Sequence, residues 1–174
     1  MRPKRGRYNA RTGLRELAAS LRIRDGTAVE IGSYAGESAL ILAASGKLSR
    51  LTCIDPWNDR TGELHGIHED FTIIEAAFDA AIAHEPIIRK LKAHSVDAAA
   101  TFANHSLDLV YIDGAHDLAS VRADIRAWRP KLRTGGYMSG HDYFWRFPGV
   151  LQAVYEELGK PTYVYRDSSW LVPV

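Results

Sequence analysis

The stretch Val29-Glu30-Ile31-Gly32-Ser33-Tyr34-Ala35-Gly36-Glu37-Ser38 decides the fold of this 174-residue chain. It begins within an apolar strand pattern, residues 27–31, which Gly32 ends. A nearly continuous apolar run over 37–44 follows, and such a run suits a helix buried against a sheet. Gly32 and Gly36 would let the backbone approach a ligand closely while it turns from strand into helix. The stretch therefore predicts the first strand–turn–helix unit of an alternating α/β domain.

The glycine spacing is not that of dinucleotide enzymes, G-x-G-x-x-G, because Tyr34 stands where the central glycine would be. A tight turn that binds nothing could use the same two glycines. Glu30 favours a ligand, since a carboxylate inside an apolar strand is unfavourable unless it is paired or hydrogen-bonded. The ammonium group of an amino acid would be a suitable partner.

Hydrophobic periodicity predicts alternating helices and strands along the chain. Helices are expected over 12–21, 37–44, 71–84, 95–101 (capped by Ser95), 117–131 and 148–158. Strands are expected over 27–31, 51–54, 87–93, 107–112, 137–139 (entered after a break at Gly135-Gly136), 163–165 and 170–172. The pattern indicates one α/β domain over 12–174 with a mostly parallel sheet. Its last two strands are too close in sequence for a crossover helix, so they should pair antiparallel. Residues 1–11 form a basic N-terminal arm, interpreted as a solvated chain end rather than a phosphate-binding segment.

Polar residues or glycines follow every predicted parallel strand. In order along the chain these are Gly32, Tyr34 and Gly36; Asp55; His94 and Ser95; Asp113 and His116; and His141 and Asp142. Ligands of an open parallel sheet bind outside the carboxyl ends of its strands, so these residues should share one working edge. Asp55 lies about 20 residues past the glycine loop, where an acidic residue reaches a ribose diol. An Asp-Pro turn that only ends the strand is the alternative, and the glycine loop favours the ribose.

Composition excludes several classes of protein. The net charge is +1, with 46% hydrophobic and 25% charged residues, which is ordinary for a globular protein and gives no reason to expect a polyanionic partner. Cys53 is the only cysteine, so neither an internal disulfide nor a thiolate zinc cluster can form, and it is interpreted as a small buried hydrophobe. No apolar run approaches the ~18 residues of a membrane span. A cytoplasmic location is therefore the default expectation.

Three motifs together resemble the class I methyltransferases, especially the catechol O-methyltransferase-like branch. The first is the glycine loop, 29–38. The second is Tyr111-Ile112-Asp113-Gly114-Ala115-His116, and the third joins Leu132-Arg133-Thr134-Gly135-Gly136 with Gly140-His141-Asp142-Tyr143. The likeness extends to a bacterial group that includes macrocin-type sugar O-methyltransferases and cephalosporin-hydroxylase-like proteins. It implies a Rossmann-like three-layer sandwich with a seven-stranded, mostly parallel sheet whose last strand is antiparallel.

The resemblance implies S-adenosylmethionine as the cofactor. Its amino-acid end would lie near Glu30, Gly32 and Ser38, its ribose at Asp55, and its adenine beside Ser95 and Val96. The full set of expected cofactor-binding residues is Glu30, Gly32, Ser33, Tyr34, Gly36, Ser38, Asp55, Pro56, Trp57, His94, Ser95, Val96 and Asp113.

The resemblance also points to a metal and a base. Catechol-type relatives bind a divalent metal at positions that carry Asp113, His141 and Asp142 here. His141 replaces a carboxylate, so this set suits Mg²⁺ less and Mn²⁺, Fe²⁺ or Zn²⁺ more. His116 falls where those relatives have a catalytic lysine and is predicted, with Asp113, to be catalytic, because an imidazole can accept a hydroxyl proton. Its alternative role is to cap the following helix. Two further histidines, His65 and His68, are too few for a metal site and are assigned to a solvated loop over 58–70.

Three functions are compatible with this pattern. The first is an O-methyltransferase acting on a hydroxyl of a small molecule or sugar, with or without a metal. Its acceptor pocket could be lined by Trp57, Tyr143, Phe144 and Trp145, which could equally be packing at its rim. The second is a non-catalytic adenosyl-cofactor-binding module, which the joint presence of Asp113, His116 and Asp142 disfavours. The third is a nucleic-acid methyltransferase, disfavoured because Asp113-Gly114 replaces the Asn/Asp-Pro-Pro-aromatic motif. The expected partner is thus a small-molecule or glycan hydroxyl acceptor, without nucleic acid or membrane, and a homo-oligomer is left open.

Overall fold

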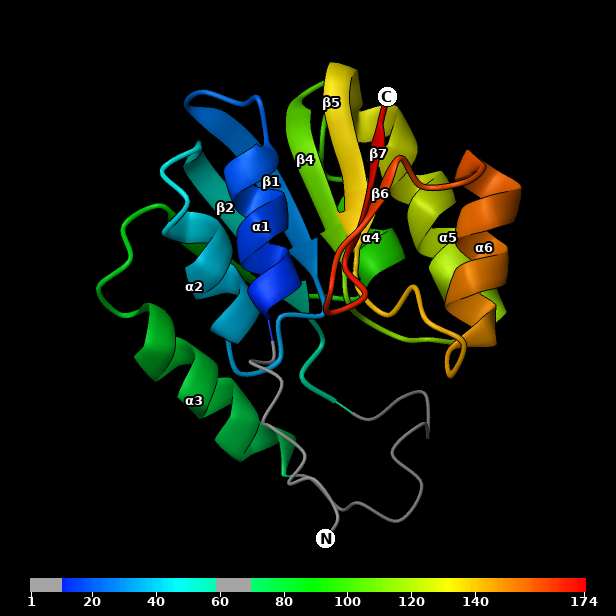
Figure 1. Ribbon diagram of the computed structural model, residues 1–174. Helices are drawn as coiled ribbons and strands as arrows, with labels where there is room; N and C mark the ends of the chain where they lie inside the picture. Colours follow the sequence, from blue (N-terminus) through cyan, green and yellow to red (C-terminus); the bar gives the residue numbers. More distant parts are fainter. Residues whose placement is uncertain (1–10, 59–69) are drawn as a thin grey trace, which may run out of the picture.

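The computed structural model describes residues 11–58 and 70–174. Helices and strands alternate along them, as the hydrophobic pattern predicts (Figure 1). The helices are α1 (Thr12–Ser20), α2 (Glu37–Ala43), α3 (Phe71–Ile82), α4 (Ser95–Ala99), α5 (Leu118–Trp128), the short 3₁₀ helix η1 (Arg129–Lys131) and α6 (Pro148–Leu158). The strands are β1 (Gly26–Ile31), β2 (Leu48–Asp55), β3 (Ile88–Lys92), β4 (Leu107–Ile112), β5 (Leu132–Gly140), β6 (Tyr163–Val164) and β7 (Trp170–Pro173).

The seven strands form one sheet in the order β3-β2-β1-β4-β5-β7-β6. Strands β1 to β5 pair in parallel, and β7 pairs antiparallel with both β5 and β6. The expected seven-stranded, mostly parallel Rossmann-like sheet is confirmed. The chain winds outward from β1 to β3 and then returns to β4 on the other side of β1. This reversal opens a crevice at the carboxyl ends of β1 and β4, which is where ligands of such sheets bind.

Alternate residues of each central strand face opposite helical layers, because side chains on a strand alternate between its two faces. Ala28 of β1 packs in one buried cluster with residues of α1, α2 and α3. Val29 and Ile31 pack in a second cluster with residues of α4, α5 and α6. Cys53 belongs to the first cluster and is fully buried, as predicted. The sheet is thus covered on both faces (Figure 1), which explains why the central strand β4 is apolar at nearly every position.

Two local predictions were wrong. Gly135-Gly136 does not interrupt the chain before the fifth strand, because β5 already begins at Leu132. The pair instead forms an irregularity inside β5, where Gly135 has φ +83°. The Gly135 amide donates a hydrogen bond to the Val174 carbonyl oxygen, and the Val174 amide donates one to the Gly136 carbonyl oxygen. Ser95 does not cap α4 either. His94 occupies the cap position without a side-chain cap, and the Ser95 hydroxyl accepts a hydrogen bond from Trp128 Nε1 at 2.8 Å.

None of the helices in the described part of the chain combines the length and apolar character that crossing a bilayer requires. The predicted loop over 58–70, with His65 and His68, lies almost entirely outside the described residues, and so do residues 1–10 of the basic arm.

Candidate functional site

A pocket of about 810 Å³ opens at the carboxyl ends of β1, β2, β3 and β4. Most of the predicted cofactor residues line it, namely Gly32, Ser33, Tyr34, Ser38, Asp55, Pro56, His94, Ser95, Val96 and Asp113. The predicted catalytic residue His116 lines it as well. The volume falls in the range of small-molecule and cofactor sites. Residues from the ends of four different strands therefore meet in one cavity, as the strand-end argument predicted.

The glycine loop lies directly against the end of β4. Gly32 has φ +81°, and a Cβ built there would be 2.3 Å from the Asp113 carbonyl oxygen. Any side chain would therefore meet both backbone strain and a steric clash. Gly36 has φ +89° and precedes α2 in a left-handed conformation. Gly32 is thus needed for the close approach of two backbone segments, whereas Gly36 is needed for its left-handed backbone, where a Cβ would lie 3.2 Å from the Phe78 side chain.

Asp55 ties the glycine loop to the end of β2. Its Oδ2 accepts a hydrogen bond from the Tyr34 amide at 3.0 Å, and its Oδ1 accepts one from the Trp57 amide at 2.7 Å. The indole of Trp57 donates to the Tyr34 carbonyl oxygen at 2.9 Å. Trp57 is itself buried and stacks near Phe78, so it supports the loop from beneath rather than lining the pocket. Each Asp55 oxygen keeps a second lone pair that can accept a hydrogen bond from a ligand hydroxyl.

Glu30 lies beneath the glycine loop and is fully buried. Neither of its carboxylate oxygens has a hydrogen-bond partner within the described residues, and the same is true of the Ser33 hydroxyl above it. Burial raises the pKa of Glu30, while the nearby hydroxyls of Ser33 and Ser38 oppose the shift. Glu30, Gly36 and Trp57 are the predicted cofactor residues that do not line the pocket. An unsatisfied carboxylate beneath a cavity is nonetheless a feature that a bound cation can relieve.

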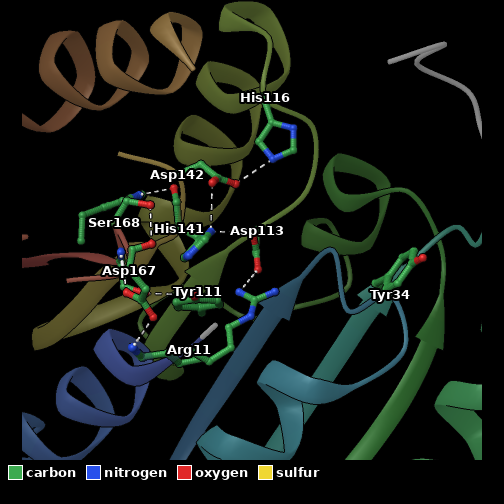
Figure 2. Close-up of polar contacts among 12 residues, drawn as sticks. Arg11, Tyr34, Tyr111, Asp113, His116, His141, Asp142, Asp167 and Ser168 are labelled. Atoms are coloured by element: carbon green, nitrogen blue, oxygen red, sulfur yellow. Dashed lines mark hydrogen bonds and ion pairs between the residues drawn. The ribbon is translucent and has the colours of Figure 1, made fainter. Parts of the chain in front are cut away.

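A chain of alternating acids and bases borders the pocket on the β4–β5 side (Figure 2). Arg11 Nη1 lies 2.6 Å from Asp113 Oδ2, and His141 Nδ1 lies 3.7 Å from Asp113 Oδ1. Asp142 Oδ1 is 3.1 Å from the same His141 nitrogen, and Asp142 Oδ2 is 2.8 Å from His116 Nε2. The order of contacts is Arg11, Asp113, His141, Asp142 and His116. Each carboxylate therefore lies between two basic groups.

The network shifts the pKa of its members in different directions. Burial raises the pKa of Asp113, although Arg11 and His141 oppose that shift. Burial would also raise the pKa of Asp142, but hydrogen bonds from His116 and His141 outweigh it and lower the pKa. Burial would lower the pKa of His141, whereas its contacts with Asp142 and Asp113 raise it. Asp142 is thus a stable anion that favours the protonated form of His141.

His116 does not cap the following helix. Asp117 caps α5 by accepting hydrogen bonds from the amides of Ala119 and Ser120, both at 3.0 Å. The His116 ring instead stacks on Phe147, with ring centroids 4.5 Å apart, while its Nε2 contacts Asp142. The alternative role from the sequence is therefore wrong, and the ring is held at the pocket wall by a carboxylate and an aromatic face.

The predicted metal ligands Asp113, His141 and Asp142 come together, with one ligand atom from each within 4.8 Å of the others. Arg11, however, already neutralises Asp113, and His116 and His141 each contact an oxygen of Asp142. The cavity that the three residues border measures only about 10 Å³, room for about one water molecule. With Arg11 in place the residues do not fit a divalent metal and its ligands.

The aromatic residues expected around an acceptor do not line the pocket. Trp145 is 69% exposed, and Phe144, which is 41% exposed, packs beside it. Tyr143 packs against the second buried cluster, so the rim-packing alternative describes these residues better. The aromatic residues in the pocket wall are Tyr34, Phe71 and Phe147.

Sequence reasoning missed three charged residues of the site, Arg11, Glu37 and Asp124. Arg11 precedes α1 and reaches Asp113 across 102 positions of sequence. Asp124 lies on α5, is 7% exposed, and lines the pocket beside Ser120 and Ala123. For Asp124 a signal existed, since an aspartate on the apolar face of a helix is unusual. Arg11 gave no signal, because a basic residue near a chain end is most often solvated.

Comparisons with known proteins identify the family. A family model described as a methyltransferase domain matches residues 29–143, more than half of the chain. No curated protein sequence gives a significant match.

Solved structures share the fold at low sequence identity. CalS11, a TDP-rhamnose 3'-O-methyltransferase of calicheamicin biosynthesis, has a TM-score of 0.59 at 15% identity over 92% of this chain and 75% of that chain. A protein from Corynebacterium glutamicum has a TM-score of 0.56 at 22% identity over 82% and 67%. A spermidine synthase bound to the transition-state analogue AdoDATO has a TM-score of 0.60 at 15% identity over 91% and 57%.

The chain spans about half the length of several further matching structures, 49% in three of them. At these identities the likeness concerns the fold, whereas the family match covers the glycine loop, Asp55, Asp113 and the His141–Asp142 pair. The chain therefore belongs to the methyltransferase-domain family.

Proposed function

We propose that this protein is an S-adenosylmethionine-dependent O-methyltransferase acting on a hydroxyl group of a small molecule or sugar. The observation that carries the proposal is the position of His116, which lines the same pocket as the glycine loop and is held by the anionic Asp142 at 2.8 Å. A pocket that binds a methyl donor beside an oriented imidazole suits the methylation of a hydroxyl, whose proton must be removed. The fold shared with a sugar O-methyltransferase agrees with this choice.

The pocket suits the cofactor. There is no room for a side chain at Gly32, between the loop and Asp113. A loop backbone without side chains lets a ligand approach it closely. The unsatisfied carboxylate of Glu30 lies beneath the loop and Asp55 at its side, which suits a cationic amino-acid end followed by a ribose. S-adenosylmethionine, when bound, supplies an electrophilic methyl group on a sulfonium.

The protein's own residues perform the rest of the reaction. A carboxylate can only accept hydrogen bonds, so His116 donates to Asp142 through Nε2 and, when neutral, has its lone pair on Nδ1. His116 removes the acceptor hydroxyl's proton as the oxygen–carbon bond forms and the carbon–sulfur electron pair returns to sulfur. Asp142 fixes the ring and stabilises the imidazolium that results. The mechanism has no step through a metal, since the residues do not fit one.

Binding of the product S-adenosylhomocysteine tests the cofactor assignment by isothermal titration calorimetry. We expect wild-type protein to bind it, and Asp55→Asn to weaken binding about tenfold or more by loss of a charge-assisted hydrogen bond. Asp79→Asn is the matched control, because Asp79 is exposed on α3 and pairs with Lys90 instead. Absence of binding by the wild-type protein would refute the proposal.

Turnover tests the reaction. Transfer of radiolabelled methyl from S-adenosylmethionine to panels of sugar nucleotides, glycosides and phenols should give O-methylated products with at least one class. Products methylated only on nitrogen or on nucleic acid would replace the O-methyltransferase assignment. Binding of the cofactor without transfer to any panel would favour the non-catalytic module.

A further inference from the structure

Asp124 is a buried acidic side chain of the pocket that the proposed reaction does not use. It lies on α5, on the same side of the helix as Ser120 and Ala123, and all three line the pocket. These two small residues leave space above the helix, while Asp124 as a residue is only 7% exposed. A carboxyl this buried needs hydrogen-bond donors.

A relay of side chains holds the Asp124 carboxyl. Trp128 Nε1, one turn further along α5, donates to the Ser95 hydroxyl oxygen at 2.8 Å. The oxygen of Ser95 thus acts as an acceptor, and the same hydroxyl lies near Asp124, where it opposes the effect of burial on the pKa of that carboxyl. One hydroxyl cannot satisfy a carboxylate, which has about four acceptor positions. Since Asp124 lines the pocket, its remaining acceptor positions are accessible to a ligand there.

The surroundings of Asp124 indicate which kind of hydrogen-bond donor suits its carboxyl group. The charged residue with the strongest effect on it is another acid, Asp117, and burial with this like charge raises the pKa of Asp124 to about 6. Within residues 11–58 and 70–174, no lysine, arginine or histidine forms an ion pair with Asp124. The apolar and small neighbours suit a flat, neutral ligand group that carries an N–H donor.

The position of Asp124 in the pocket indicates which ligand group carries this donor. Ser95 and Val96 follow β3, two strands outward from β1 in the sheet order, beyond Asp55 at the end of β2. A nucleoside whose ribose lies at Asp55 therefore extends its base toward Ser95 and Asp124. We propose that Asp124 accepts a hydrogen bond from the exocyclic amino group of adenine and makes the pocket selective for adenosyl over oxopurine ligands. This inference rests on the proposed cofactor.

A structural role is the competing explanation. Asp124 could serve only to hold Ser95 at the first turn of α4, which has no side-chain cap at His94. In that case its replacement would loosen α4 and would weaken all nucleoside ligands alike. Asn is a suitable replacement because it keeps the size and one acceptor oxygen while it turns the other oxygen into a donor.

Calorimetric titration with two ligands separates these explanations. S-adenosylhomocysteine carries the adenine amino group, and S-inosylhomocysteine carries a carbonyl oxygen in its place. We expect the wild-type protein to prefer the adenosyl ligand by about tenfold or more, the value of one discriminating hydrogen bond. Asp124→Asn should reduce this preference to about threefold or less, because the Asn amide can donate to the carbonyl oxygen.

Asp97→Asn is the matched control, since Asp97 is an exposed acid in the first turn of α4 and does not line the pocket. It should keep the wild-type preference. An unchanged preference in Asp124→Asn, or equal weakening of both ligands, would overturn the role of Asp124 and leave the cofactor assignment intact. If the wild-type protein binds neither ligand, the proposed function fails first.

Discussion

At the scale of single residues, the site depends on how buried charges are paired. Asp142 contacts two imidazoles, His116 at 2.8 Å and His141 at 3.1 Å, and these contacts lower its pKa despite burial. For Asp124, burial and the like charge of Asp117 raise the pKa, and the Ser95 hydroxyl opposes that shift. The surroundings of the two aspartates agree with the different roles that we propose, Asp142 as the residue that orients a base and Asp124 as an acceptor for a ligand.

Replacement of His116 tests its role as the base. We expect His116→Gln to reduce kcat by about 10²- to 10⁴-fold, the usual contribution of a general base, with little change in S-adenosylhomocysteine affinity. Asp142→Asn should reduce kcat less, and should move the lower limb of the pH–rate profile to lower pH, because the imidazolium loses its anionic partner. Rates are measured on the acceptor found by the methyl-transfer panels. A full wild-type rate in His116→Gln would rule out this base.

Asp124 also affects stability, with a defined pH dependence. Its pKa rises from 3.8 in the unfolded chain to about 6 in the fold, so the folded state favours the neutral acid. The resulting stability is present below about pH 4 and is lost as pH rises through about 6. Asp124→Asn should therefore be more stable than wild type at pH 7.5, by up to about 3 kcal/mol. Urea unfolding at pH 7.5 and pH 4 measures this, and a gain that does not shrink at the lower pH would contradict it.

At the scale of elements, the pocket exists because the turn after β1 packs against the end of β4. The Gly32 amide donates to the Ile54 carbonyl oxygen at 2.9 Å, and the Asp113 amide donates to the Ile31 carbonyl oxygen at 2.8 Å. The loop is thus bonded to strands on both sides, and its backbone is held where a ligand can approach it. The start of α1 joins the same edge through the Arg11–Asp113 ion pair.

Alanine replacements at two glycines separate backbone strain from close approach. Gly32 and Gly46 both have positive φ, +81° and +67°, but only Gly32 has atoms within 4 Å of a built Cβ. Gly46→Ala should cost about 1 kcal/mol from the left-handed backbone alone. Gly32→Ala should cost more and should also abolish S-adenosylhomocysteine binding, because the loop must move away from Asp113. Thermal unfolding and calorimetry measure the two effects, and equal losses at both sites would contradict a close-approach role.

At the scale of the whole molecule, the winding of the sheet collects charged residues from distant parts of the chain into one network. Arg11 precedes α1, Asp113 follows β4, and His141 and Asp142 follow β5. Parallel strands place their carboxyl ends together, so groups that are far apart in sequence become neighbours. The cation that balances Asp113 is then a side chain of the same protein.

Chelation tests whether that internal cation is sufficient. Methyl transfer and melting temperature should be unchanged by EDTA, and added Mg²⁺ or Mn²⁺ should not increase the rate. Arg11→Met should lower stability by about 3 kcal/mol, because it leaves Asp113 without its counter-ion, and the double variant with Asp113→Asn should recover most of the loss. Activity that is lost in EDTA and restored by Mn²⁺ would show that a metal displaces Arg11 in the working enzyme.

The sequence by itself determined the elements and the edge at which they act. Apolar periodicity located the helices and strands to within a few residues, because burial of one face is a local property of the chain. Gly32 and Asp55 were recognisable since each follows a strand, and the direction of a parallel sheet brings strand ends together. The methyltransferase family could be inferred from motifs at those ends.

Only the tertiary structure decided how the side chains at that edge are paired. The contact of Arg11 with Asp113 spans 102 residues, and no periodicity encodes which distant charge will neutralise a given carboxylate. The hydrogen bond between Trp128 and Ser95, which turned a predicted cap into part of the pocket wall, likewise depends on how α5 packs beside α4. Local patterns determine which face of an element is buried, whereas pairing within the buried site depends on distances between elements, and these exist only after the chain has folded.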